Sequence, residues 1–349
     1  MEGTVHALES FTRVAKLGVR RCEPAALDVP PILSASIYCH GFLDELLREV
    51  ILPFWKVTKT VIPQSRLWVI RYARGGQHLK IRFHVPVEVQ VTTAARLEDA
   101  VDRFFSGLPA PSGVERDIAA HLPPIDPEDH AADLRPDRSL LWTRYRFLPE
   151  LIGAEPLSAA PGFEAVFVRC RAASTEVTLD WLDDLETGEI PMRKRMALAL
   201  QLFLAAVCGV HPQAETRARY LIFQRDWLLR VSPDREQTLV LLERKVDEVL
   251  AKHSALGPLF TATFPQDGVL GSWYRAVGDL VRFCLDQLKR QDLSELDSAS
   301  ENLIYFAICR VVHNAMNLTA IGLLNEAYLC HLLGSALARA RTEEGTRGS

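Results

Sequence analysis

The sequence lacks closely paired cysteines and long hydrophobic runs. Its seven cysteines are scattered, odd in number and never spaced as CxxC, which indicates neither a zinc site nor a disulfide framework. The longest apolar run, residues 196–210, contains Gln201 and is shorter than the roughly 18 residues of a membrane span. Residues 1–23 hold no continuous apolar core, so no signal peptide is predicted. We therefore expect a cytoplasmic protein with reduced thiols and no membrane partner.

Motifs for nucleotides and catalytic metals are also missing. The chain has no P-loop, no GxGxxG fingerprint, no HExxH and no GxSxG, so ATP, NAD and hydrolytic zinc lack support. The formal net charge is −4, whereas binding to a phosphate backbone needs a concentrated basic surface. We expect no metal site and no nucleic-acid partner.

The composition is that of a folded globular protein. Of its 349 residues, 48% are apolar and 24% are charged, enough for one large domain or two packed lobes. We predict an N-terminal arm over residues 1–29, a single body over 30–341 and a frayed tail over 342–349. Within the body, residues 30–190 are expected to be rich in sheet and residues 191–341 to be helical.

The clearest β signal is a hairpin. Residues 66–72 are rich in β-branched and aromatic side chains, a glycine turn follows, and residues 77–85 alternate between polar and apolar. Because side chains alternate across a strand, four titratable or cationic residues share one face: His78, Lys80, Arg82 and His84. The pattern alone leaves two interpretations open. An exposed face would be solvated, whereas a covered face would bind carboxylates, amide oxygens or oxyanions.

Other segments complete the predicted fold. Strands are expected at 32–39, 140–147 and 165–170, and a helix is expected after Gly41 that ends at Pro53. Residues 107–139 are rich in Pro, Asp and Ala and indicate a long surface connection. Six helices are predicted at 192–210, 213–230, 237–252, 270–290, 299–316 and 319–341. The fold class is therefore α+β, with a small mixed or antiparallel sheet packed against a largely helical C-terminal half.

The helix predicted at 299–316 carries a second polar group of residues. Arg310, His313 and Asn317 follow at i, i+3 and i+7, so they form one stripe beside an apolar face. Tyr305 lies about 80° around the helix from His313. A lone histidine in such a helix is more often a hydrogen-bonded core residue than a catalyst, and the neighbouring arginine and asparagine make the two interpretations comparable.

Aromatic residues gather at 142–147. Trp142, Tyr145 and Phe147 alternate with charged residues, as in an amphipathic strand whose aromatic side faces the core. The functional alternative is an aromatic wall for a flat substrate. Spacing alone favours the core.

Two motifs resemble those of a known family. Residues 68–72 (WVIRY) and 78–83 (HLKIRF) resemble the FIRYxDPxxHLRLRF signature of the lantibiotic-dehydratase C-terminal domain, also called the thiopeptide-type biosynthesis domain. Residues 312–317 (VHNAMN) are similar to the family motif HMHxNR, and Glu326 falls where a glutamate follows in that pattern. The resemblance covers residues 30–335. Elimination enzymes of this family remove glutamate from glutamylated Ser or Thr, using arginines and the motif histidine.

The chain departs from the elimination enzymes at three places. Lys80 stands where an arginine is usual, Leu318 stands where HMHxNR ends in arginine, and residues 145–154 lack the Arg-Tyr-Gly-Gly of the pattern YxxExxRYGG. Arg82 and His313 remain. Losing guanidinium forks weakens bidentate binding of a glutamyl carboxylate, and lysine does not replace that geometry.

The resemblance therefore implies a stand-alone thiopeptide pyridine synthase. Such enzymes join two dehydroalanines of an azole-bearing peptide by a formal aza-[4+2] cycloaddition, expel water and the leader peptide, and need no cofactor because no net redox change occurs. The implied partner is a leader-bearing precursor peptide, with further biosynthetic enzymes as additional candidates. The predicted catalytic residues are His313, Tyr305, Arg82 and Lys80. The predicted substrate-binding residues are His78, His84, Tyr145, Arg310, Asn317 and Trp142.

Two alternatives stay open. The chain could be the glutamate-elimination subunit of a split dehydratase, with relocated arginines, or a non-catalytic scaffold that presents the peptide to partner enzymes. Leader recognition is expected away from the chemistry, in residues 1–29 or 107–139. The active cleft is expected between the hairpin and the helix at 299–317.

Overall fold

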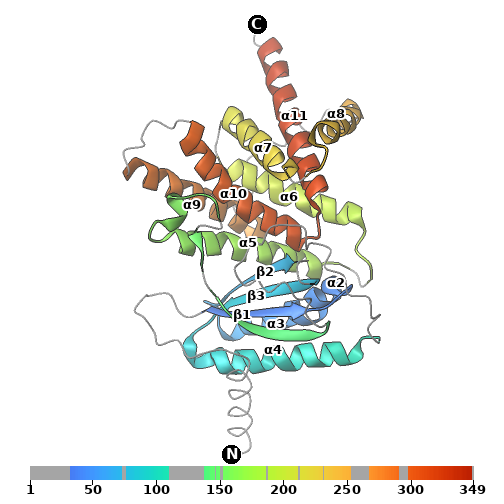
Figure 1. Cartoon of the computed structure of the whole chain (residues 1–349), viewed down its shortest axis with the longest axis vertical. Coiled ribbons are helices and arrows are strands. Elements are labelled where there is room, and N and C mark those ends of the chain that lie inside the picture. Colours follow the sequence, from blue (N-terminus) through green and yellow to red (C-terminus); the bar gives the residue numbers. More distant parts are fainter. Residues whose placement is uncertain are drawn as a thin grey trace, which may run out of the picture. The chain divides into compact units, whose positions relative to one another are not determined.

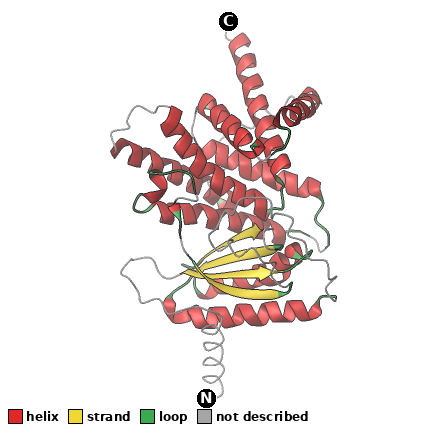
Figure 2. Cartoon of the chain, in the orientation of Figure 1, coloured by secondary structure: helices red, strands yellow, loops and turns green. Residues whose placement is uncertain are grey.

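The structure, a computed structural model, describes residues 32–72, 76–109, 137–145, 147–149, 152–185, 188–210, 213–230, 232–252, 267–290 and 298–347. These residues form two compact units. The first takes in the described residues up to Phe147 together with Leu179–Leu185, and the second takes in the described residues of Leu148–Thr178 and of Glu186–Ser349. The strands of the described chain lie in the first unit, whereas the described part of the second unit is built from helices (Figure 2).

The sheet of the first unit is antiparallel throughout. Its four described strands are β1 (Ile32–Tyr38), β2 (Arg66–Tyr72), β3 (His78–His84) and β4 (Ser139–Arg144), in the order β2-β3-β1-β4. The predicted hairpin is confirmed, since β2 pairs with β3 in the register Trp68↔Arg82 and Ile70↔Lys80. The expected α+β class, with a small sheet and a largely helical C-terminal half, is confirmed as well.

The apolar face of the sheet packs on helices of the same unit. Leu79, Ile81 and Phe83 are fully buried, and the ring of Phe83 meets that of Phe54 edge-on at a centroid distance of 5.2 Å. Helix α4 (Val87–Gly107), for which the sequence analysis assigned no structure, lies along the sheet in Figure 1. The unit thus buries one face of the sheet in an ordinary apolar core.

A continuous helical segment crosses Pro53, where the sequence analysis placed a helix end. Helix α2 (Leu43–Leu46) passes through a π-helical turn (Leu47–Ile51) into α3 (Leu52–Val61). The predicted stop was wrong because the π-helical turn at Leu47–Ile51 replaces the regular i→i−4 bonds directly before Pro53, where the proline has no N–H to donate.

The helical second unit matches most of the predicted segments within a few residues. Its longer helices are α5 (Phe163–Asp183, whose last residues belong to the first unit), α6 (Met192–Val210), α7 (Ala214–Leu229), α8 (Arg235–Lys252), α9 (Gly268–Arg290), α10 (Ser298–Leu318) and α11 (Leu323–Arg347). Helix α11 begins four residues later than predicted and runs to Arg347, whereas the prediction ended at 341.

The strand predicted at 165–170 is wrong, because these residues lie inside α5. Buried residues recur through the helix at 163, 167, 170, 174 and 177, which is the spacing of a helical face. A window of six residues was too short to separate this pattern from a buried strand.

Close helix packing in the second unit depends on a glycine. A Cβ atom added at Gly209 of α6 would stand 2.9 Å from the carbonyl oxygen of Tyr274 in α9. The indole Nε1 of Trp273 donates to the carbonyl of Leu202 at 2.9 Å between the same two helices. The missing side chain therefore lets the two backbones approach closely.

A tight corner joins α10 to α11. Ala320 has a φ of 60°, its N–H donates to Asn317 O at 3.0 Å, and the N–H of Ile321 donates to Met316 O at 2.9 Å. These bonds form a Schellman motif, in which the left-handed position usually holds glycine. The side chain of Arg195 supports the corner by donating to Thr319 O at 3.1 Å.

Several predictions fall outside the described residues. They concern the arm at 1–29, most of the connection at 107–139 and the side chains of the tail at 342–349.

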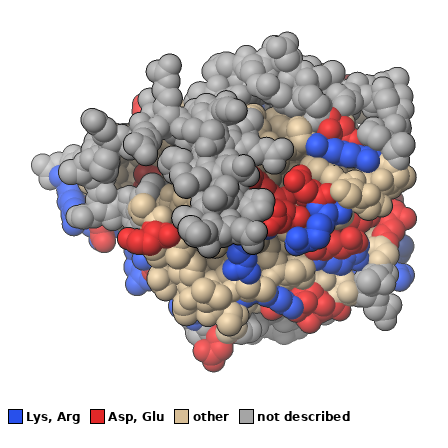
Figure 3. All heavy atoms as spheres, turned by 90° about the horizontal axis from the view of Figure 1, so that it is seen from below, with Lys and Arg blue, Asp and Glu red and all other residues tan. Residues whose placement is uncertain are grey.

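No helix within the described ranges is both long enough and apolar enough to cross a bilayer. On the face drawn in Figure 3, acidic and basic side chains of the described residues lie interspersed.

Candidate functional site

The polar face of β3 is buried. His78 is 1% exposed, Lys80 3% and Arg82 5%, so the solvated-face interpretation is wrong for these three residues. Ser34 and Ser36 of β1 lie beside Arg82 and Lys80 in the sheet register and are buried too. Buried charge requires partners, so this face is suited to contact polar groups.

Aromatic rings hold two of these side chains. The imidazole of His78 stacks on Tyr38 at 4.4 Å and on Tyr72 at 5.5 Å between ring centroids, and its Nδ1 donates to Gly76 O at 2.8 Å. Lys80 Nζ lies 4.4 Å from the centroid of the Tyr72 ring, a cation–π contact. His78 and Lys80 are thus joined through one tyrosine.

A second aromatic group surrounds Arg82. Its Cζ lies 5.0 Å from the ring centroid of Tyr145, and Tyr145 meets Trp68 edge-on at 5.7 Å. The Nε1 atom of Trp68 is buried and has no hydrogen-bond partner among the described residues. The structure therefore brings together Arg82 and Tyr145, two residues that the sequence analysis placed in the site.

Trp142 and His84 stand apart from this group. Trp142 pairs with Ala35 on the opposite face of the sheet, and its Nε1 donates to Glu98 of α4 at 2.8 Å. His84 lies at the end of β3 and is half-buried, and burial together with the nearby Arg66 lowers the pKa of its imidazole. A substrate-binding role for either residue stays a prediction.

The second group of predicted site residues lies on α10, in the second unit. His313 Nδ1 is 2.7 Å from Oε2 of Glu326 in α11, and its Nε2 is 3.1 Å from Nδ2 of Asn317. The side chain of His313 is 11% exposed and that of Glu326 is fully buried. A histidine between a carboxylate and an amide can accept or release a proton while its ring stays in place.

Trp227 of α7 links His313 to Arg310. The indole stands edge-on to the imidazole at a centroid distance of 5.5 Å, and the guanidinium Cζ of Arg310 lies 5.3 Å from the indole centroid. Arg310 also donates from Nε to Ile152 O at 3.3 Å. The predicted stripe is therefore present, with a cation one aromatic ring away from the histidine.

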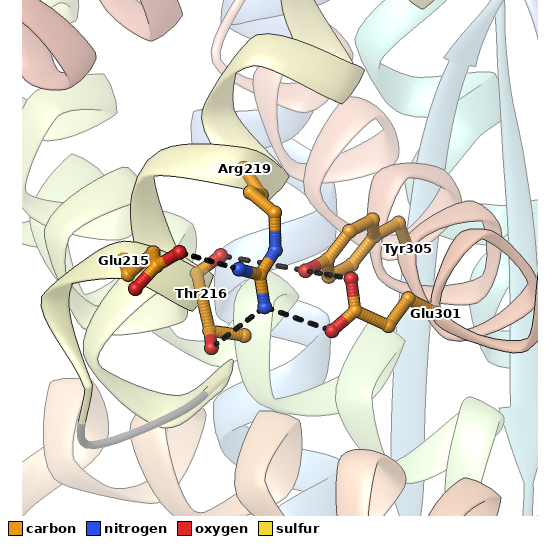
Figure 4. A network of polar contacts seen from close by, with 5 residues as sticks. All are labelled: Glu215, Thr216, Arg219, Glu301 and Tyr305. Atoms are coloured by element: carbon orange, nitrogen blue, oxygen red, sulfur yellow. Dashed lines mark hydrogen bonds and ion pairs between the residues drawn. The ribbon is translucent and has the colours of Figure 1, made fainter. Parts of the chain in front are cut away.

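Tyr305 belongs to a different polar network, shown in Figure 4. Its hydroxyl is 3.5 Å from both Thr216 O and Glu301 Oε2, while Arg219 donates to Glu301 Oε1 at 2.9 Å. Burial raises the pKa of the Tyr305 hydroxyl. Eight residues separate Tyr305 from His313, about 12 Å along a helix axis, so the two side chains do not meet directly.

The described residues contain no group of three or more His, Cys, Asp or Glu side chains placed to hold a metal ion. All the described cysteines are buried, and burial raises the pKa of Cys39 and of Cys284 to about 12. These thiols are therefore protonated and unreactive near neutral pH.

The sequence analysis gave no role to Glu326 and missed Gln224 and Trp227. The sequence does contain a signal for Glu326 and Gln224, because each of these polar residues interrupts an apolar helical stripe. Gln224 lies between buried Tyr220 and Leu228 at spacings of four, and Glu326 precedes buried Cys330 by four. A buried polar side chain on such a stripe requires a partner.

The sheet and helices are those of a known protein family. The family model of the lantibiotic biosynthesis dehydratase C-terminal domain matches residues 33–337, and the chain belongs to this family. The resemblance seen in the sequence motifs is thereby confirmed. No curated protein sequence matches the chain closely.

The fold is shared with several solved structures, among them a pyridine synthase and a lantibiotic dehydratase. The pyridine synthase TbtD, from thiomuracin biosynthesis, is similar with a TM-score of 0.62 and 15% identity, over 88% of this chain and 98% of TbtD. The tRNA-dependent lantibiotic dehydratase MibB from Microbispora sp. 107891 is similar with a TM-score of 0.54 and 14% identity. That match covers 93% of this chain but only 29% of MibB, so the chain spans less than a third of the dehydratase.

Proposed function

We propose that the chain is a pyridine synthase acting on a ribosomally made peptide that bears azoles and two dehydroalanines. The reaction is a formal aza-[4+2] cycloaddition followed by loss of water and of the leader peptide, and it leaves a macrocycle. The shared fold with TbtD over nearly its whole length supports the class of enzyme.

The observation that carries the proposal is that two arginines of the family motifs are replaced while the motif histidine is retained. Leu318 ends α10 with 1% exposure, where the family motif has arginine, and Lys80 lies over the ring of Tyr72. Neither residue offers the planar fork that binds a glutamyl carboxylate. His313 has a carboxylate and an amide partner, which orient its ring for proton transfer.

The first chemical task is a proton shift. One peptide amide becomes an iminol when its N–H proton leaves and its oxygen gains a proton, and the resulting azadiene reacts with the second dehydroalanine. Two C–C bonds then form to the alkene carbons of the second dehydroalanine, one from the methylene carbon of the first dehydroalanine and one from the iminol carbon. They close a six-membered ring that contains the amide nitrogen. In this proposal His313 moves the proton, and Arg82 and Lys80 polarise the amide oxygen.

The remaining tasks are eliminations and positioning. The iminol oxygen leaves as water and the leader leaves as a neutral amide. Each departing group gains one proton, and each elimination removes one hydrogen from a ring methylene, so the ring becomes an aromatic pyridine. Holding the two alkenes together lowers the barrier by about 7–11 kcal/mol, because translational and rotational freedom is lost before the reaction begins. No electron acceptor is consumed, so the steps balance without an oxidant.

Mass spectrometry with a leader-bearing, azole-containing peptide that carries two dehydroalanines tests the proposal. We expect release of the intact leader amide together with a macrocycle lighter by water, with no cofactor added. An unchanged peptide, combined with conversion of a glutamylated precursor to dehydroalanine, would contradict it.

That second outcome would identify a glutamate-elimination subunit, which one observation favours. Arg310 lies on the indole of Trp227, the same ring that contacts His313. An arginine relocated to this position would supply the guanidinium that Leu318 lacks. Arg310→Lys would then reduce elimination from the glutamylated peptide, whereas pyridine formation would be affected less.

A further inference from the structure

A chain of hydrogen bonds crosses the helices around His313. It starts at the hydroxyl of Tyr220 in α7, passes through Gln224 and Glu326, and ends with His313 and Asn317 on α10. Tyr220, Gln224 and Glu326 are each fully buried. Such a chain is stable only when each donor meets an acceptor, so its polarity can be assigned.

The polarity is set at both ends. Asn317 presents its amide nitrogen to Nε2 of His313 at 3.1 Å, and an amide nitrogen only donates. Nε2 therefore carries a lone pair, and the ring proton lies on Nδ1, which donates to Glu326 Oε2 at 2.7 Å. In the neutral ring the proton therefore lies on Nδ1.

The second carboxylate oxygen of Glu326, Oε1, also accepts a hydrogen bond. Gln224 Nε2 donates to Glu326 Oε1 at 2.7 Å, and the Tyr220 hydroxyl donates to Gln224 Oε1. Because the Glu326 carboxylate only accepts, the amide nitrogen of Gln224 must face it, which leaves the amide oxygen to accept from Tyr220. Both oxygens of Glu326 thus receive a hydrogen bond, as a buried carboxylate needs.

We propose that Glu326 is a positioning residue, oriented by Gln224 and Tyr220, that keeps His313 in the Nδ1–H tautomer. Nε2 is then the atom that exchanges protons with the substrate, and Asn317 is the group beside it. When Nε2 takes a proton, Asn317 turns its amide so that Oδ1 accepts instead. The use of the proton in pyridine formation rests on the proposed function, whereas the tautomer does not.

Among the titratable and charged groups near these hydrogen bonds, the Glu326 carboxylate is the one that faces His313. Burial is the main cause that raises the pKa of the Cys309 and Cys330 thiols, with the Glu326 carboxylate contributing, so both thiols stay neutral. Arg310 contacts Trp227, and Arg195 donates to the carbonyl of Thr319. On the other side of α11, Arg225 donates to His331 rather than toward His313.

The tautomer can be measured without any substrate. In the protein labelled with ¹⁵N at histidine, the His313 signals are assigned by their loss in His313→Asn. We expect a pyrrole-type Nδ1 and a pyridine-type Nε2. The opposite pattern, with the proton on Nε2, would overturn the assignment whatever reaction the enzyme performs.

Substitutions at Glu326 separate its positioning role from the fold. Glu326→Leu removes both acceptors, and we expect His313 to move toward the Nε2–H tautomer and kcat to fall about ten- to a hundredfold with little change in KM. Glu326→Gln keeps an acceptor if Gln224 and the Tyr220 hydroxyl reverse, so we expect most of the Nδ1–H tautomer and an intermediate kcat. Tyr220→Phe removes only the last donor and should change both readouts least.

An unchanged tautomer and unchanged kcat in folded Glu326→Leu would overturn the inference. If that variant does not fold, the same two readouts in Glu326→Gln and the tautomer of the wild-type protein decide. Absence of pyridine product with the expected ¹⁵N pattern would sink the proposed function and leave the role of Glu326 standing.

Discussion

The indole of Trp227 stands at 82° to the imidazole of His313, with the ring centroids 5.5 Å apart. This edge-to-face contact restricts rotation of the imidazole, while hydrogen bonds at its two nitrogens fix which way the ring points. The arrangement gives α10 an ordered proton-accepting atom, and several measurements follow from it and from the fold around it.

Replacement of His313 tests the proton-transfer role directly. We expect His313→Asn to lower turnover about 10²- to 10⁴-fold, since that is the usual contribution of a positioned acid or base. The matched control is His331→Asn on α11, a half-buried histidine bonded to Arg225, which should keep its rate. Product formation by mass spectrometry is the measurement, and equal rates for His313→Asn and wild type would remove His313 from the mechanism.

Tyr305 is predicted to supply a proton although its hydroxyl lies in the network of Figure 4. We expect Tyr305→Phe to lower kcat about a hundredfold, because the proton for a leaving group is lost. Tyr328→Phe on α11, another tyrosine whose pKa is raised by burial, serves as the control. A normal kcat together with lower thermal stability would make Tyr305 a structural partner of Glu301 and Arg219.

Trp142 offers a contrast between substrate binding and stability. Because its indole donates to Glu98 on the apolar side of the sheet, we expect Trp142→Phe to lower the free energy of unfolding by about 1–3 kcal/mol. The Michaelis constant for the peptide should stay the same. A raised KM in a variant of wild-type stability would instead restore the aromatic-wall role.

The corner between α10 and α11 contains removable strain. Ala320 has a φ of 60°, which alanine adopts at a cost that glycine avoids, so Ala320→Gly should raise the free energy of unfolding by about 0.5–1 kcal/mol. The same substitution at the exposed helical residue Ala338 should lower it by about 1 kcal/mol. Denaturant unfolding measures both, and a destabilised Ala320→Gly would contradict the strain.

Buried thiols predict a loss of stability at high pH. Burial raises the pKa of Cys284 from 9.0 to about 12 in the folded protein, so above pH 9 the unfolded chain loses a proton that the folded chain keeps. Fewer protons bound in the unfolded state make stability fall as pH rises from about 9 toward 12. In urea unfolding between pH 8 and 10, Cys284→Ala should show a shallower fall than wild type, and equal slopes would refute this contribution.

Local patterns predicted much of the fold. The boundaries of β2 (Arg66–Tyr72) and α6 (Met192–Val210) agree with the predicted ones, because alternation and a long apolar helix leave little ambiguity. The strand predicted inside α5 and the helix end at Pro53 failed, since a six-residue window and a single proline do not settle an element on their own.

The sequence predicted which candidate residues share a face, but not the partners of their side chains. Strand alternation placed Lys80 and Arg82 on one face, and helical spacing placed His313 beside Asn317. The pairing of His313 with Glu326 depends on how α11 turns back against α10, which is a tertiary property. Spacing also placed Trp142 near Tyr145 in sequence without revealing that it packs on the other side of the sheet.

The short connection from Thr319 to Gly322 has a consequence for how this chain can vary. Each residue added to or removed from a helix start turns the following side chains by about 100° around the axis. With the start of α11 held in place by this corner, a single insertion or deletion at the helix start would turn Glu326 away from His313 while leaving every helix intact. Length changes at this corner should therefore be selected against in descendants of this sequence and avoided in engineered ones, even where each single-residue replacement is accepted.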